Sequence, residues 1–175
     1  MLRLQRVALL PLSILLATAC GDDDAGGGSE ASVAQYFADF ATISDDGQAQ
    51  IAELGDKYPD AFEGDVQQTQ DSYGEYIVIF DDTVSLWEAL NVPEELKLLH
   101  DEVIEANSEL SAINHQRLDR LGDASSPEEV DDVFFAEGPE LTEFTDAVAR
   151  TDSVCEELED RAAEFDIELD LNCER

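Results

Sequence analysis

Apolar residues recur along most of the chain at steps of three and four, the spacing that gathers them on one face of an α-helix. The first such segment runs from about residue 30 to 58. Asp45-Asp46-Gly47 lies in its middle, and an aspartate-glycine pair is a turn signal that would break the helix. We expect one continuous helix, because the apolar phase is the same on both sides of this stretch. Its predicted buried face consists of Val33, Phe37, Phe40, Ser44, Gly47, Ile51, Leu54 and Tyr58.

Two further helical patterns follow, over about residues 65–90 and 96–121, joined by a short connection at 91–95. Residues 76–80 are β-prone by residue type, but the helical spacing continues on both flanks and favours a helix. The predicted buried face of the second helix consists of Val66, Tyr73, Tyr76, Ile77, Phe80, Val84, Trp87 and Leu90. That of the third consists of Leu96, Leu99, Val103, Ala106, Leu110, Ile113 and Leu121.

The last helical pattern is interrupted. Ser126-Pro127-Glu128-Glu129 is typical of a helix start, with a capping serine, then proline and two acids in the first turn. The short segment that begins there ends at Gly138-Pro139, and a longer one runs on to Phe165. Apolar residues then alternate with acids over residues 167–171, as in a half-buried extended tail. The predicted buried face of the longer segment consists of Leu141, Phe144, Val148, Cys155, Leu158, Ala162 and Phe165.

Short connections between long amphipathic helices imply antiparallel neighbours. The sequence therefore predicts an all-α domain over residues 30–175, an antiparallel up-down four-helix bundle with a short extended C-terminal tail. Ten helical residues rise about 15 Å and eight extended residues span up to about 26 Å, so the tail can turn at Asp166 and return along the helix. We expect a disulfide between Cys155 and Cys173 that clips the tail and contributes about 3 kcal/mol by closing the loop.

The first residues carry the three parts of an export signal. Arg3 and Arg6 supply positive charge, and residues 7–16 form an apolar run too short for a membrane span, which needs about 20 residues. Ala17-Thr18-Ala19 then satisfies the small-x-small rule for an ordinary signal peptidase. We expect residues 1–19 to be a signal peptide that is removed on export.

A second processing route competes at the same place. Leu16-Ala17-Thr18-Ala19-Cys20 resembles the lipobox of bacterial lipoproteins, although leucine stands four residues before the cysteine where that family prefers three. The resemblance implies that a diacylglycerol is attached to the Cys20 thiol and that the mature chain begins there. Residues 21–29 are rich in Gly, Asp and Ser, which predicts a flexible tether with a reach of roughly 15–18 Å. An unlipidated Cys20 would leave an exposed reactive thiol, so we favour the anchor.

The chain has 43 acidic and 9 basic residues and a formal net charge of -34. Such a surface repels nucleic acid and anionic lipid headgroups, so we expect no nucleic-acid partner and contact with the membrane only through the lipid anchor. The charge has two interpretations. It provides solubility and self-repulsion, or it forms a surface that binds cations or a cationic ligand.

Candidate chemistry is sparse. His100 and His115 both fall on the third helix, about 22 Å apart along its axis, so they cannot share a metal ion within that helix. The sequence contains no Glu-x-x-His, no Gly-x-Ser-x-Gly, no phosphate-binding glycine loop and no calcium loop with the required spacing. We therefore predict no catalytic residues, no metal site and no cofactor, and we expect both histidines at the edge of the bundle.

The body also resembles small acidic, helical bacterial lipoproteins that end in a paired-cysteine tail, here Cys155 and Asp170-Leu171-Asn172-Cys173. This resemblance implies fold and location only. We expect a lipid-anchored protein on the extracytoplasmic face of the cell membrane, a non-enzymatic binding or interaction module whose partner is an envelope protein or a cationic ligand. The alternative is an acidic surface protein that binds divalent cations. An enzyme would need a buried carboxylate cluster around His100 or His115.

Overall fold

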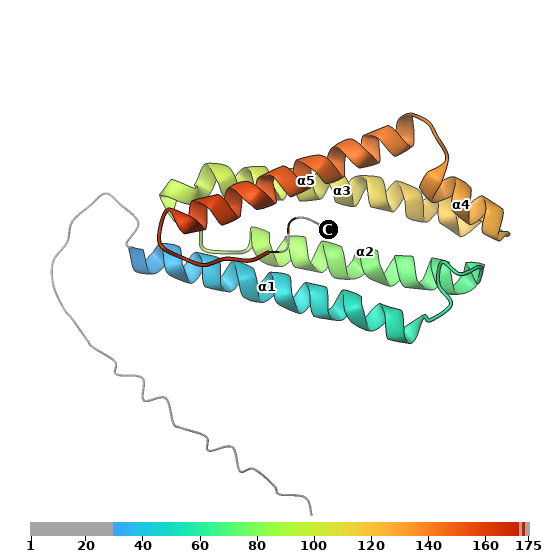
Figure 1. The fold of residues 1–175 in the computed structure, drawn as a ribbon, viewed down its shortest axis with the longest axis horizontal. Coiled ribbons are helices and arrows are strands. Elements are labelled where there is room, and N and C mark those ends of the chain that lie inside the picture. The colour runs from blue at the N-terminus through green and yellow to red at the C-terminus, as the bar shows by residue number, and fades with distance from the viewer. Residues whose placement is uncertain (1–29, 172, 174–175) are drawn as a thin grey trace, which may run out of the picture.

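A computed structural model describes residues 30–171 and residue 173, and within them it contains helices, turns and an extended tail but no strand (Figure 1). The all-α prediction is confirmed. The predicted signal peptide, residues 1–19, and the segment 20–29 lie outside the described residues. The elements are α1 (Glu30–Lys57), α2 (Val66–Glu88), the short 3-10 helix η1 (Glu94–Leu96), α3 (Lys97–Asp123), α4 (Pro127–Phe135) and α5 (Pro139–Ala163).

The long helices α1, α2, α3 and α5 lie side by side, and each runs opposite to the one before it (Figure 1). Direct packing joins α1 to α2, α2 to α3 and α3 to α5, while the short α4 packs on α3. The tail after α5 turns back and runs between α5 and α1 (Figure 1). The chain therefore brings its last segment to the place where its first and last helices face each other.

Helix α1 is continuous through Asp45-Asp46-Gly47, as the apolar phase predicted. Gly47 is buried against α2, where a β-carbon would lie 2.7 Å from Thr83 Oγ1. The glycine is therefore the result of a close approach between two helices, and it does not mark a turn.

Local signals set the starts of α2, α4 and α5. The Asp65 carboxylate accepts a hydrogen bond from the Gln68 backbone N–H at 3.0 Å, which caps α2. Ser126 accepts one from the Glu129 N–H at 3.3 Å, and Pro127 occupies the first turn of α4 as predicted. The break at Gly138-Pro139 is also confirmed, since α5 begins there.

The end of α5 returns the chain toward α1. Asp166 adopts a left-handed backbone conformation with φ of 56°, a region that aspartate tolerates better than most residues. The N–H groups of Asp166 and Ile167 donate to the carbonyls of Ala163 and Ala162, both at 3.1 Å. These two bonds are the pattern of a Schellman C-cap, and they direct the tail back along α5.

Buried apolar residues form two clusters. The first core lies at the end of the molecule where α1 and α3 begin and α5 ends, and the second core lies toward the opposite end, under α4. The first core consists of Val33, Tyr36, Phe37, Phe40, Leu96, Val103, Ala106, Val154, Leu158, Ala162, Leu171 and Cys173. The second core consists of Tyr73, Ile77, Leu121, Val130 and Val133.

The buried face of α3 differs from the predicted stripe. His100, Asn107 and Asn114 are buried at seven-residue intervals, whereas Leu99 and Ile113 are only half-buried. The expectation that His100 lies at the edge is wrong: it is 5% exposed, and its Nδ1 lies 3.1 Å from the hydroxyl of the buried Tyr36. A hydrogen-bonded neutral imidazole is tolerated in a core, and burial lowers the pKa of His100.

Candidate functional site

A cavity of about 240 Å³ lies between the long helices, next to the first core. All four long helices and the tail contribute to its wall. The lining residues are Phe40, Ser44, Gly47, Gln48 and Ile51 of α1, Tyr76, Phe80, Thr83 and Trp87 of α2, Val103 and Asn107 of α3, Thr151, Val154, Cys155 and Leu158 of α5, and Leu171 of the tail.

The cavity exists because short side chains from every helix meet at one level. Ser44, Gly47, Thr83, Asn107 and Thr151 line it together. Natural cores are usually filled by Leu, Ile or Phe at such positions, at a packing density near 0.74. With short side chains on all sides at this level, the space between the helices is left open.

The short polar side chains are satisfied by their own helices. Ser44 Oγ donates to the Phe40 carbonyl and Thr83 Oγ1 to the Ile79 carbonyl, both at 2.8 Å. Asn107 Nδ2 donates to the carbonyl of Val103 at 2.8 Å, and Thr151 Oγ1 to that of Ala147 at 3.0 Å. Each side chain donates to the carbonyl four residues back along its own helix, so the hydroxyl donors of Ser44, Thr83 and Thr151 need no partner inside the cavity.

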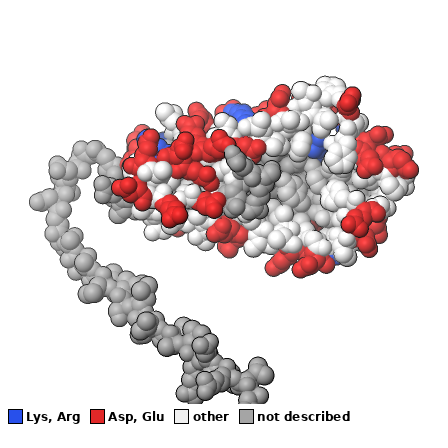
Figure 2. Space-filling model, viewed as in Figure 1, with Lys and Arg blue, Asp and Glu red and all other residues white. Residues whose placement is uncertain are grey.

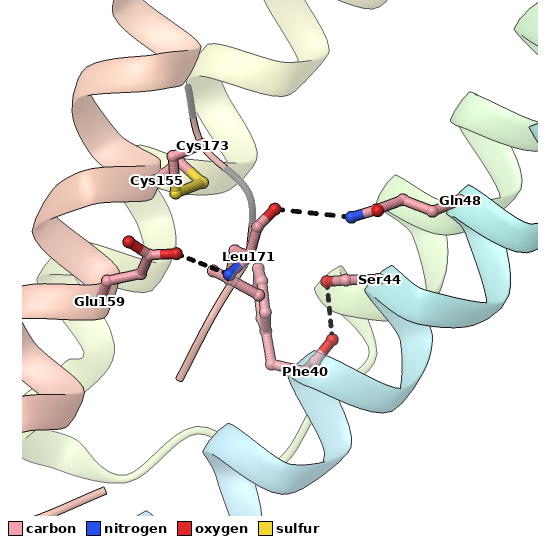
Figure 3. The surroundings of a disulfide bond; sticks show 7 residues. All are labelled: Phe40, Ser44, Gln48, Cys155, Glu159, Leu171 and Cys173. Carbon is pink, nitrogen blue, oxygen red and sulfur yellow. Dashed lines mark hydrogen bonds between the residues drawn. A yellow bond between two sulfur atoms is a disulfide. The ribbon is translucent and has the colours of Figure 1, made fainter. Parts of the chain in front are cut away.

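The tail closes one side of the cavity. Leu171 donates its backbone N–H to Glu159 Oε1 on α5 at 2.6 Å, and its carbonyl accepts from Gln48 Nε2 on α1 at 3.5 Å (Figure 3). Cys155 and Cys173 lie next to this contact with their Cα atoms 5.6 Å apart (Figure 3). The tail thus bridges α5 and α1 and contributes an apolar side chain to the cavity wall.

Trp87 forms one end of the cavity. Its ring stacks on Phe40, with ring centroids 4.7 Å apart and an angle of 3° between the planes. Trp87 Nε1 is buried without a hydrogen-bond partner among the described residues and is fully enclosed. A ligand in the cavity therefore meets the aromatic surface of Trp87 and does not reach its N–H. Trp87 is also the only tryptophan in the sequence, so its fluorescence reports on this place alone.

A second group of polar residues borders the second core, to which Tyr73 itself belongs. The Tyr73 hydroxyl donates to Asn114 Oδ1 at 2.9 Å, and the guanidinium of the buried Arg117 lies 3.5 Å from the centre of the Phe144 ring. Burial raises the pKa of Tyr73 to about 12, although the nearby Arg117 acts in the opposite direction. This arrangement is explained by packing, since it ties α2, α3 and α5 together.

The remaining predicted sites have different outcomes. Cys20 lies outside the described residues. Across residues 30–171, no three or more His, Cys, Asp or Glu side chains converge in a way that could hold a metal ion. His115 is exposed, with Nε2 2.7 Å from Asp81 Oδ2, and so lies at the edge as expected. Within the same residues, no helix is both long enough and apolar enough to cross a membrane.

Comparison with other proteins adds nothing to this picture, because no known protein family, curated protein or solved structure matches the chain. The site has to be interpreted from its own residues. The helical pattern alone does not reveal the cavity, although the sequence carries a signal for it. Ser44 and Gly47 fill positions on the predicted buried face of α1, and Thr83, Asn107 and Thr151 are the matching short residues on the other helices.

Proposed function

We propose that the mature protein is an exported binding module, anchored by a lipid on Cys20, which holds a small ligand between its helices. The cavity of about 240 Å³ enclosed by α1, α2, α3, α5 and the tail is the observation that carries this proposal. Largely apolar cavities of this kind are the usual sites of small-molecule binding in helical bundles. The export signal and the lipobox-like Leu16–Cys20 support an extracytoplasmic location.

The finer description of the fold belongs to the same proposal. We infer an antiparallel up-down four-helix bundle in which a disulfide between Cys155 and Cys173 clips the tail. The alternating helix directions support the bundle (Figure 1). A Cα separation of 5.6 Å suits a disulfide, and an exported protein meets the oxidising conditions in which such bonds persist.

Binding fits the cavity better than catalysis does. No carboxylate, imidazole, amine or guanidinium lies among the residues that line it. General acid-base chemistry most often uses such a group within hydrogen-bond reach of the substrate. The cavity therefore offers shape and apolar surface, which are the properties of a binding site.

Intact mass measurement of the mature protein from its native host tests the anchor and the clip. We expect a chain that begins at Cys20, carries a diacylglycerol, and gains about two mass units on reduction of one disulfide. An unlipidated chain would refute the anchor, and an unchanged mass on reduction would refute the clip. Extraction of the same sample with organic solvent should release a small molecule in stoichiometric amount.

The alternative function, a surface that binds divalent cations, rests on the formal net charge of -34. Calorimetric titration with calcium separates it from the proposed function. Only weak, salt-dependent heats are expected from a diffuse acidic surface. Tight and stoichiometric binding of calcium would favour the alternative.

A further inference from the structure

We infer that the cavity selects a largely apolar molecule that is neutral or positively charged, and rejects anionic molecules of the same shape. This inference rests on the proposed function, since it names the class of ligand for the same cavity. Three properties of the molecule support it: the chemistry of the wall, the size of the cavity and the charge around it.

The chemistry of the cavity wall favours an apolar ligand. Ser44, Thr83, Asn107 and Thr151 each direct a hydrogen-bond donor to their own helix, so few donors are left for a polar ligand atom. The rest of the wall is mainly aromatic and aliphatic. A polar ligand group placed there would lose its hydrogen bonds to water without replacement, at a cost of roughly 1–3 kcal/mol.

The size of the cavity sets the size of the ligand. An apolar cavity of about 150 Å³ accommodates one benzene molecule. The cavity here measures about 240 Å³, which is room for a molecule larger than a single ring, such as a fused bicyclic or a short branched hydrocarbon. A long acyl chain would have to extend out of it.

The surrounding charge decides between ligands of equal shape. Acidic side chains cover much of the face seen in Figure 2, and basic ones are few. Several of the cations are already paired with carboxylates: Lys57 with Glu75, Arg120 with Glu140, Arg150 with Glu105 and Glu109, and Arg161 with Glu164. Glu159 places a further carboxylate at the tail, beside the wall formed by Leu171. An anion entering the cavity meets this field with no positive partner among the lining residues.

Two dyes with the same ring system test the inference. Naphthylamine is neutral, and aminonaphthalene sulfonate adds one negative charge to the same fused bicyclic skeleton. The protein used is the mature chain from residue 20 with Cys20→Ser, which needs no detergent and leaves the described residues unchanged. Energy transfer from Trp87 to the dye reports binding at the cavity, because the chain has no other tryptophan.

We expect the neutral dye to bind at least about tenfold more tightly than the sulfonate at low salt. In about 1 M salt the difference should shrink, because the Debye length falls to about 3 Å. Equal or tighter binding of the sulfonate at low salt would overturn the inference and leave the proposed function standing. Absence of energy transfer with both dyes would overturn the proposed function itself.

A matched pair of threonines on α5 locates the binding. Thr151 and Thr145 both donate to the carbonyl four residues back, but Thr151 lines the cavity and Thr145 is exposed. Thr151→Leu should fill the cavity and weaken binding of the neutral dye by at least about tenfold, while Thr145→Leu should leave it unchanged. Ser44→Val repeats the test from the opposite wall if Thr151→Leu fails to fold. Equal binding by a folded cavity variant and by Thr145→Leu would contradict the assignment.

Discussion

The two cores of this molecule are held together in different ways. The first core draws buried residues from α1, α3, α5 and the tail, and it contains Cys173 of the cysteine pair. The second core is smaller, draws on α2, α3 and α4, and is bordered by the Tyr73–Asn114 hydrogen bond and the stacked Arg117. The candidate cavity lies beside the larger core, whose residues Phe40, Val103, Val154, Leu158 and Leu171 line it.

The difference between the two cores shows where the helices are less tightly packed. A cavity lowers stability because the atoms around it lose contacts that a filled core would supply. Here the cavity adjoins the region with the most buried apolar residues, where Cys155 and Cys173 lie with their Cα atoms 5.6 Å apart. The first core therefore borders the candidate cavity, while a smaller opening of about 110 Å³ lies against Val130 of the second core.

Replacement of either of two buried leucines by alanine is expected to lower the free energy of unfolding the most. Leu121 of the second core is 0% exposed, and Leu158 of the first core is 1% exposed and lines the cavity. Leu121→Ala should lower the free energy of unfolding by about 4–5 kcal/mol, and Leu158→Ala by about 2–3 kcal/mol, because the open space beside Leu158 lets the surrounding side chains relax into the gap. Urea denaturation measures both values. A larger loss for Leu158→Ala would show that the cavity is filled in solution.

Removal of the proposed disulfide between Cys155 and Cys173 is expected to have the next largest effect on stability. The double variant Cys155→Ser/Cys173→Ser should lose about 3 kcal/mol of unfolding free energy, since closing a loop of this length restricts the unfolded chain. Reduction of the wild-type protein should give the same loss, and reductant should leave the variant unchanged. If reductant has no effect on the wild type, the tail is held by packing alone.

Two glycines of α1 test the close approach of α1 and α2. Gly55 has open space around its Cα, so Gly55→Ala should raise the unfolding free energy by about 0.5–1 kcal/mol. A β-carbon at Gly47 would meet Thr83 Oγ1, so Gly47→Ala should lose about 1–2 kcal/mol in spite of the better helix former. Thermal unfolding of both variants measures these effects. Equal shifts in Tm would contradict a close approach of α1 and α2 at Gly47.

The smallest effect is a pH dependence in the first core. Burial lowers the pKa of His100, with Asp101 and Glu88 partly opposing the shift. The unfolded chain then takes up a proton near the ordinary pKa of about 6.5, before the folded protein does. Stability from the neutral ring is therefore complete above about pH 6.5 and is lost as pH falls toward the lower folded pKa. His100→Gln should flatten the unfolding free energy between about pH 7 and 5.5, and an unchanged slope would contradict this.

The sequence was sufficient where a local signal decided the structure. The phase of the apolar residues predicted that α1 continues through Asp45-Asp46-Gly47, and Ser126-Pro127 predicted the start of α4. These features depend on residues within a few turns of each other, so they can be read from one segment of chain.

The sequence was insufficient where the partner lies on another helix. His100 and Asn114 were left off the buried face of α3 because they are polar. Tyr36 of α1 and Tyr73 of α2 supply the hydrogen bonds that allow them to be buried. The cavity was missed for the same reason: its short residues meet only when the relative heights of four helices are known. The seven-residue spacing of His100, Asn107 and Asn114 was the available clue.

Hydrogen exchange with and without naphthylamine tests most directly the claim that a ligand binds beside the first core. The dye should slow exchange in peptides that cover residues 40–51 and 76–87, which line the cavity, and leave residues 127–135 of α4 unchanged. Protection confined to α4, or none at saturating dye, would contradict the account.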